Sequence, residues 1–114
     1  MKLYSYANCS TCRKALQWLA QRGIAVDPID ITRQPPTLAE LQLVIDQLGR
    51  SKLFNTSGQS YRALGAATVK AMDDTQALEA LTADGRLIKR PLLITDEQRV
   101  LIGFQPLEWQ ALLS

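Results

Sequence analysis

Two cysteines lie three positions apart in the segment NCSTCRK, residues 8–14, directly before a helical pattern. A thiolate at a helix N-terminus faces unpaired backbone N–H groups and the positive end of the helix dipole, which lower the pKa of the thiol. Cys9 has this position, and Cys12 lies one turn further along the same helix. We therefore predict that Cys9 is the nucleophile of a thiol–disulfide reaction. Cys12 is then the resolving thiol, which attacks the mixed disulfide formed on Cys9.

The same two cysteines have two other interpretations. A structural zinc site needs four ligands, and this chain has two cysteines and no histidine, so a metal would have to be shared by a dimer. Cysteine is also among the most buried residue types, so two unreactive core thiols are the second alternative. A Cys-x-x-Cys pair after a predicted strand favours redox chemistry over both, and we expect no metal. The lack of histidine also excludes Cys–His catalysis.

Length and composition predict one domain over residues 1–114. With 46% hydrophobic residues, the chain can bury a core without disulfides or metals. A net charge of only +2 gives no argument for binding nucleic acid or an anionic membrane. No run approaches the roughly 18 apolar residues of a membrane-spanning helix, and the N-terminus lacks the apolar core of a signal peptide. We therefore expect a cytoplasmic protein whose thiols are kept reduced.

The residues around the cysteines predict a β-α-β unit. Residues 2–6 alternate and are rich in aromatic residues, as in a strand, and the apolar positions after Cys9 recur with the period of a helix. Gly23 is placed to end this helix. Residues 24–31 form a second predicted strand, which Pro28 restricts to the edge of a sheet because proline donates no ladder hydrogen bond.

The middle of the chain predicts helices. Two of them, at residues 37–48 and 73–84, begin with a capping box, a pair of residues three apart that satisfy each other's backbone N–H groups. The pairs are Thr37 with Glu40 and Asp73 with Gln76. The apolar face of the first helix is expected to consist of Leu38, Leu41, Ile45 and Leu48, and Gly49 and Gly85 are placed to end the two helices. A shorter helix is expected at residues 61–64.

The end of the chain returns to strand patterns. Residues 91–95 and 99–104 predict a hairpin joined by residues 96–98, and a last helix follows at 107–113. The order β-α-β, helices, β-β-α is that of a thioredoxin-like fold with a helical insertion. We therefore predict an α/β protein with a four-stranded mixed sheet.

The dipeptide Arg90–Pro91 is the second candidate functional feature. A proline ahead of a strand, after a long excursion of the chain, is a candidate cis peptide in this architecture. A cis bond there would bring Arg90 and the start of the strand against the cysteine loop. The alternative, which the residues alone favour, is an arginine on a surface loop before a proline that starts a strand.

Four segments together resemble the arsenate reductase/Spx-like family, a group of thioredoxin-like proteins with a helical insertion. They are the first strand, NCSTCRKALQWL, LFNTSGQSYRALG and IKRPLLIT, and the resemblance covers nearly the whole chain in order. It implies the thioredoxin-like fold more directly than the periodicity does.

One branch of this family consists of glutathione-dependent arsenate reductases, whose C-x-x-S-R loop resembles residues 9–13. In those enzymes three arginines hold arsenate, and of the three only Arg90 has a counterpart. The other two positions fall near Asn55 and residues 102–103, and a histidine of their first strand falls near Ser5. Each lost charge-assisted hydrogen bond is worth about 1.5–3 kcal/mol, which argues against efficient arsenate reduction.

A second branch consists of Spx-type regulators, which use a Cys-x-x-Cys switch and bind the α-subunit of RNA polymerase. This sequence resembles them in the cysteine pair, in Arg90 and in a glycine near the end of the second helix, Gly49. It ends at Ser114 without their basic C-terminal extension, so we expect regulation to be the alternative function. The best match is with short Spx-like proteins, whose thiol function the motifs do not define.

The cysteine pair and the resemblance together predict a thiol–disulfide oxidoreductase that is linked to glutathione or glutaredoxin and has no bound cofactor. Arg90 is expected to bind the anionic part of the substrate, with Arg13 as a weaker contributor. Ser10 and Thr11 are expected to offer backbone N–H groups, and Pro91 a backbone edge for a substrate peptide. An arsenate reductase and a redox-sensing regulator that binds RNA polymerase remain the alternatives.

Overall fold

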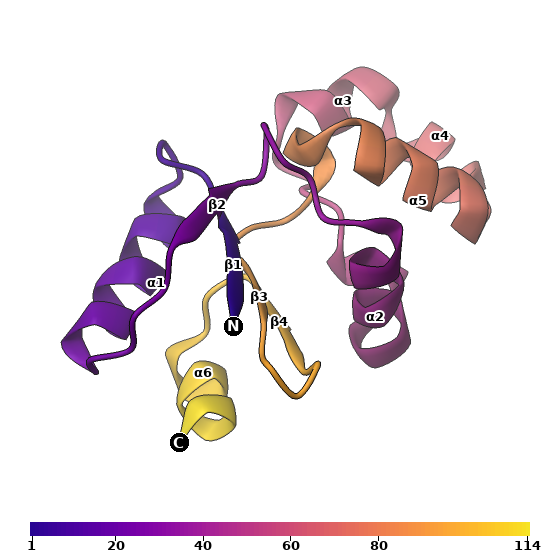
Figure 1. Cartoon of the computed structure of the whole chain (residues 1–114). Helices are drawn as coiled ribbons and strands as arrows, with labels where there is room; N and C mark the ends of the chain where they lie inside the picture. The colour runs from indigo at the N-terminus through magenta and orange to yellow at the C-terminus, as the bar shows by residue number, and fades with distance from the viewer. The chain divides into compact units, whose positions relative to one another are not determined.

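The computed structural model describes residues 1–114 (Figure 1). Contacts within the chain separate it into two units. One unit consists of Met1–Asp30 and Arg90–Ser114, and the other of Ile31–Lys89. The single domain expected from the sequence stays a prediction. None of the helices has both the length and the apolar character needed to cross a bilayer.

The first unit contains the sheet. Its elements are β1 (Lys2–Ser5), α1 (Ser10–Gln21), β2 (Pro28–Asp30), β3 (Leu92–Ile94), β4 (Val100–Ile102) and α6 (Pro106–Leu113). The strand order is β2-β1-β3-β4, with β1 and β2 parallel and the other neighbours antiparallel. The predicted four-stranded mixed sheet is therefore confirmed, and β2 lies at an edge, as Pro28 predicted. The strands are shorter than the apolar runs that predicted them.

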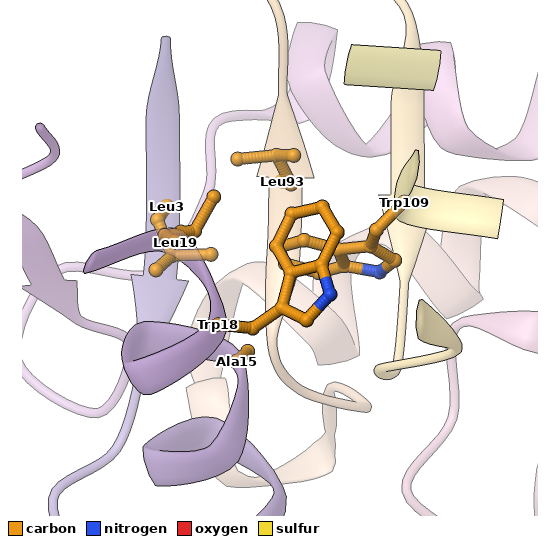
Figure 2. Close-up of a cluster of buried hydrophobic side chains, with 6 residues drawn as sticks. All are labelled: Leu3, Ala15, Trp18, Leu19, Leu93 and Trp109. Atoms are coloured by element: carbon orange, nitrogen blue, oxygen red, sulfur yellow. The ribbon is translucent and has the colours of Figure 1, made fainter. Parts of the chain in front are cut away.

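The two helices of this unit pack on a face of the sheet through one apolar cluster. Leu3 of β1 and Leu93 of β3 are register partners, and Ala15, Trp18 and Leu19 of α1 and Trp109 of α6 complete the cluster (Figure 2). The two indole rings meet edge to face with centroids 6.1 Å apart. The Trp109 indole N–H donates to the Gly103 carbonyl oxygen over 3.1 Å, so this polar group is buried with a partner. The packing fixes α1 against β1, and it thereby fixes the N-terminus of α1.

The second unit is helical. It contains α2 (Leu38–Leu48), α3 (Gln59–Leu64), α4 (Ala66–Ala71) and α5 (Asp74–Ala83), with 3-10 turns at Arg50–Lys52 and Gly85–Leu87. Both predicted capping boxes are present, at the N-termini of α2 and α5. The α4 helix was not predicted, because it is a single short segment that begins directly after Gly65 and has only Val69 buried.

Two predictions for this unit are wrong in part. Leu38 and Leu48 were assigned to the apolar face of α2, but their side chains are 54% and 38% exposed, because they lie in the first and last turns. The buried residues of α2 are Leu41 and Val44. Gly85 does not end α5, which stops at Ala83.

A close approach of two backbone segments explains why residue 85 is glycine. Gly85 is buried, and a Cβ atom at this position would lie 1.9 Å from the carbonyl oxygen of Ile31. Only glycine therefore permits this approach of the two backbone segments.

Candidate active site

Cys9 is the N-cap residue of α1, and its backbone is extended, with φ −92° and ψ 115°. Its sulfur accepts a hydrogen bond from the Cys12 backbone N–H over 3.2 Å. Its own N–H donates to the Tyr6 carbonyl oxygen over 3.0 Å, and its carbonyl accepts from the Arg13 N–H over 3.1 Å. The loop thus directs the Cys9 sulfur at the free N–H groups of the helix, where a negative charge is stabilised.

The surroundings of Cys9 favour the thiolate. The side chain is partly buried, and this burial raises the pKa of the thiol. Other interactions outweigh this burial and lower the pKa of Cys9. They are hydrogen bonds from the Cys12 side chain and the Cys12 N–H, together with a hydrogen bond from Arg90 and its positive charge. The structure therefore joins the helix N-terminus and Arg90 at the sulfur that the sequence predicts to be the nucleophile.

Cys12 has the opposite environment. Its side chain is 0% exposed, and burial, the hydrogen bond to Cys9 and the charge of Cys9 raise the pKa of Cys12 to about 11. The Tyr6 backbone N–H and the Ser5 hydroxyl donate to the Cys12 sulfur and oppose this rise. Both cysteines are free thiols in the structure. At neutral pH the Cys12 thiol is protonated, so it donates the hydrogen bond between the two side chains and the Cys9 sulfur accepts it.

Arg90 reaches the cysteine loop through the sheet. The Arg90–Pro91 peptide bond is cis, as the sequence suggested, and Pro91 is buried directly before β3. Because Tyr4 of β1 pairs with Leu92 of β3, continuing this register by two residues brings Tyr6 opposite Arg90. The Arg90 guanidinium lies over the Tyr6 ring, 4.9 Å from its centroid.

The other predicted residues have more distant positions or other contacts. The Arg13 guanidinium donates to the Ala7 carbonyl oxygen over 2.8 Å, so it braces the loop, and it does not contribute to the pKa shift of Cys9. Ser10 and Thr11 are exposed residues of the first turn of α1. The Pro91 carbonyl oxygen accepts the Gly103 N–H over 2.9 Å, and the contact of Pro91 with a peptide stays a prediction.

Gly49 lies in the helical unit, at the end of α2. Its φ is +90°, and its N–H donates to the Ile45 carbonyl oxygen over 2.9 Å. A Cβ atom there would meet no atom within 4 Å, so the positive φ alone accounts for glycine. A partner-binding role for Gly49 stays a prediction.

Tyr6 and Ser5 contact the functional groups of the site, although neither was predicted as a site residue. Because side chains alternate along a strand, Ser5 lies on the same face of β1 as Leu3, the face that packs against α1. A serine at a core-facing position of the first strand, next to the predicted Cys-x-x-Cys helix, is therefore the sequence signal that could have predicted the contact of Ser5 with Cys12. Tyr6 had no such signal, because its contact with Arg90 depends on the pairing of β1 with β3.

We expect Tyr6→Leu to make Cys9 less reactive. The substitution removes the ring that supports the guanidinium, and a cation–π contact of this kind is worth about 0.5–1 kcal/mol. The pKa of Cys9 should rise, and alkylation by iodoacetamide below neutral pH should become about two- to fivefold slower. Tyr6→Phe keeps the ring and is the matched control. An equal loss in both variants would assign the effect to the hydroxyl group instead.

No group of three or more cysteine, aspartate or glutamate side chains is placed to hold a metal ion in residues 1–114. The prediction of a metal-free site rests on the donor set and stays a prediction.

Comparison with known proteins gives consistent matches. A model of the ArsC family matches residues 4–112. The uncharacterized protein YusI of Bacillus subtilis is 42% identical over 108 residues, which cover 92% of this chain and 91% of YusI. The global transcriptional regulator Spx 2 of Oceanobacillus iheyensis is 33% identical over 100 residues, 86% of this chain and 73% of that protein.

A solved structure supports the same relationship. The crystal structure of an ArsC-family-related protein from Bacteroides fragilis matches with a TM-score of 0.88 and 38% identity, over 98% of each chain. The resemblance found in the sequence and the predicted thioredoxin-like fold are thereby confirmed.

Proposed function

The chain belongs to the ArsC family, and we propose that within this family it acts as a thiol–disulfide oxidoreductase through Cys9 and Cys12. The observation that carries the proposal is the asymmetry of the pair. Cys9 is accessible and its pKa is lowered by Cys12 and Arg90, whereas Cys12 is buried, protonated and directed at the Cys9 sulfur. This is the arrangement that a nucleophile and a resolving thiol require.

The proposed reaction has two displacements. The Cys9 thiolate attacks one sulfur of a substrate disulfide, a mixed disulfide forms, and the first substrate thiol leaves as a thiolate that takes a proton from water. The Cys12 thiolate then attacks the Cys9 sulfur, and the second substrate thiol leaves. The substrate disulfide gains two electrons and becomes two thiols, and Cys9 and Cys12 lose two electrons and become a disulfide. Two molecules of glutathione, acting directly or through glutaredoxin, return the pair to thiols and become glutathione disulfide.

A disulfide substrate fits these residues better than arsenate. The positions of two of the three arginines that hold arsenate in the related reductases fall near Asn55 and residues 102–103, which carry no positive charge. Arg90 supplies one cation at Cys9, enough to stabilise a single thiolate. We propose the cytoplasm as the location, because glutathione keeps thiols reduced there.

Redox-controlled binding to the α-subunit of RNA polymerase is the second candidate function. The 33% identity with the regulator Spx 2 favours it. Its surface would include Gly49, at the end of α2. Co-purification of the polymerase α-subunit with one redox form of the protein alone would favour this function over the enzymatic one.

The deciding experiment is NADPH consumption in a coupled assay with glutathione and glutathione reductase. One sample receives a glutathionylated peptide and another receives arsenate. We expect turnover of the peptide that Cys9→Ser abolishes, and no turnover of arsenate. Arsenate turnover that depends on Cys9 would overturn the proposal in favour of oxyanion reduction, and inactivity toward both would favour the regulator.

A further inference from the structure

The helical unit contains a polar pocket of its own, with a volume of about 190 Å³. Phe54 is the apolar residue of its lining, and the polar residues are Ser51, Lys52, Asn55, Thr56, Ser57 and Lys89. All of these residues lie within Ile31–Lys89, so the pocket is complete inside the helical unit. Drug-sized ligands occupy pockets of about 300–1,000 Å³, so this volume suits a small group rather than a whole cofactor.

Backbone pairing brings the two lysines of the pocket together. Phe54 and Ile88 form an antiparallel bridge. Next to it, the Lys89 N–H donates to the Leu53 carbonyl oxygen over 2.7 Å. Because Leu53 directly follows Lys52 in the chain, the two lysines come from neighbouring, hydrogen-bonded segments.

Asn55 offers a neutral polar group at the same place. A Cβ atom at Gly58 would lie 2.7 Å from the Asn55 side-chain nitrogen, so glycine at this turn leaves the amide room for its present position. The Gly58 N–H donates to the Asn55 carbonyl oxygen over 3.1 Å and closes the turn. The side-chain amide itself makes no hydrogen bond within residues 1–114, so its N–H groups are available to a ligand.

The charge of the pocket is positive and unbalanced. None of its lining residues is acidic, and neither Lys52 nor Lys89 takes part in an ion pair within residues 1–114. Three hydroxyl groups and one amide add neutral hydrogen-bond donors to the two ammonium groups. Such a lining selects an anion that has two negative charges and several acceptor oxygens.

We propose that this pocket binds the phosphate dianion, either as free phosphate or as the terminal group of a phosphate monoester. A phosphate monoester carries a charge of about −1.5 to −2 at neutral pH and has three strong acceptor oxygens. Its charge therefore balances both lysines, whereas a carboxylate would balance one. The phosphate is bound without chemical change and without Cys9, so this binding is a function beyond thiol–disulfide exchange.

Binding is tested with methyl phosphate, added to the reduced, isotope-labelled protein. It should shift the amide resonances of residues 51–57 and Lys89. Methyl sulfate has the same shape and a single negative charge, and it should bind about tenfold more weakly. Equal binding of the two esters would overturn the proposal, because the pocket would then not recognise a dianion.

Two double variants test the lysines. Lys52→Gln with Lys89→Gln should weaken the binding of methyl phosphate about tenfold. Lys14→Gln with Lys70→Gln removes the same charge from exposed lysines outside the pocket, and it should bind as the wild type does. Equal loss in both double variants would reduce the effect to net charge and reject the pocket as the site.

Cys9→Ser separates this site from the cysteine chemistry, and it should bind methyl phosphate as tightly as the wild type does. Binding that disappears in Cys9→Ser would place the phosphate at the cysteine and overturn the proposal. Inorganic phosphate identifies the source of the anion. If it binds more tightly than methyl phosphate, free phosphate is the ligand, and if it binds equally or more weakly, the ligand is a phosphate monoester.

Discussion

Cys12→Ser is expected to hold a substrate thiol on Cys9 as a stable mixed disulfide, one adduct per chain. The variant keeps the position of Cys9 at the N-cap of α1, the Cys12 backbone N–H and Arg90, all of which favour attack by Cys9. It lacks the sulfur that would displace the adduct, and a serine hydroxyl does not ionise at neutral pH. The measurement is the intact mass of the protein after reaction with a glutathionylated peptide in the absence of other thiols.

The wild type is expected to finish the same reaction as the internal Cys9–Cys12 disulfide, two hydrogen atoms lighter than the thiol form and without an adduct. Cys9→Ser is the matched control, and it should carry no adduct, because the remaining sulfur of Cys12 is buried, and this burial still raises the pKa of Cys12 in the variant. An adduct on Cys12 in that control would reverse the assigned roles. A Cys12→Ser protein that releases its adduct as fast as the wild type would remove Cys12 from the mechanism.

The features that the sequence predicted correctly are mostly local. The order of Cys9, a helical period and Gly23 placed the thiol at the N-cap, because helix position follows from residues a few places apart. Pro28 placed β2 at an edge for a similar reason, since the missing N–H is a property of one residue. The cis Arg90–Pro91 bond was predictable as a candidate from the proline and the strand after it.

The contacts that activate the site depend on pairing between distant strands. The Tyr6 ring packs against the Arg90 guanidinium, and Arg90 forms a hydrogen bond with Cys9. Both contacts exist because β1 and β3 are antiparallel neighbours in one particular register. A shift of that register by one residue would turn every side chain of a strand to the other face of the sheet. The residues next to Tyr6 in the sequence do not determine how β1 pairs with β3, so the role of Tyr6 could not be predicted from local patterns.

In the helical unit, the predictions were wrong for residues whose sequence pattern fits more than one structural role. Leu38 and Leu48 fit the helical period of α2, yet its terminal turns leave them exposed. Gly85 follows a helix, as a C-terminal glycine would, but the structure requires glycine there because a Cβ atom would lie 1.9 Å from the carbonyl oxygen of Ile31. Periodicity indicates which face of a helix is apolar, and the packing of neighbouring segments decides how much of that face is buried.

The two displacement steps are expected to differ in their dependence on pH. Formation of the mixed disulfide needs the Cys9 thiolate, and because the pKa of Cys9 is lowered, its rate should level off with rising pH earlier than that of an ordinary cysteine. Release of the substrate needs the Cys12 thiolate. Because burial still raises the pKa of Cys12, the rate of release should keep rising with pH after the rate of the first step has levelled off. Quenched single-turnover reactions at several pH values measure both steps.

The physical basis of that difference is the charge on Cys9. While Cys9 is a thiolate, its hydrogen bond and its charge help burial to raise the pKa of Cys12 to about 11. In the mixed disulfide that charge is gone, so the pKa of Cys12 falls just when Cys12 must attack. The Ser5 hydroxyl and the Tyr6 N–H remain as donors to the new thiolate. Ser5→Ala should therefore slow release at every pH in the neutral range and leave mixed-disulfide formation, measured in the same reaction, unchanged. If both steps followed one pH profile in the wild type, protonation of Cys12 would not control release, and the fall in its pKa on adduct formation would lose its role in the reaction.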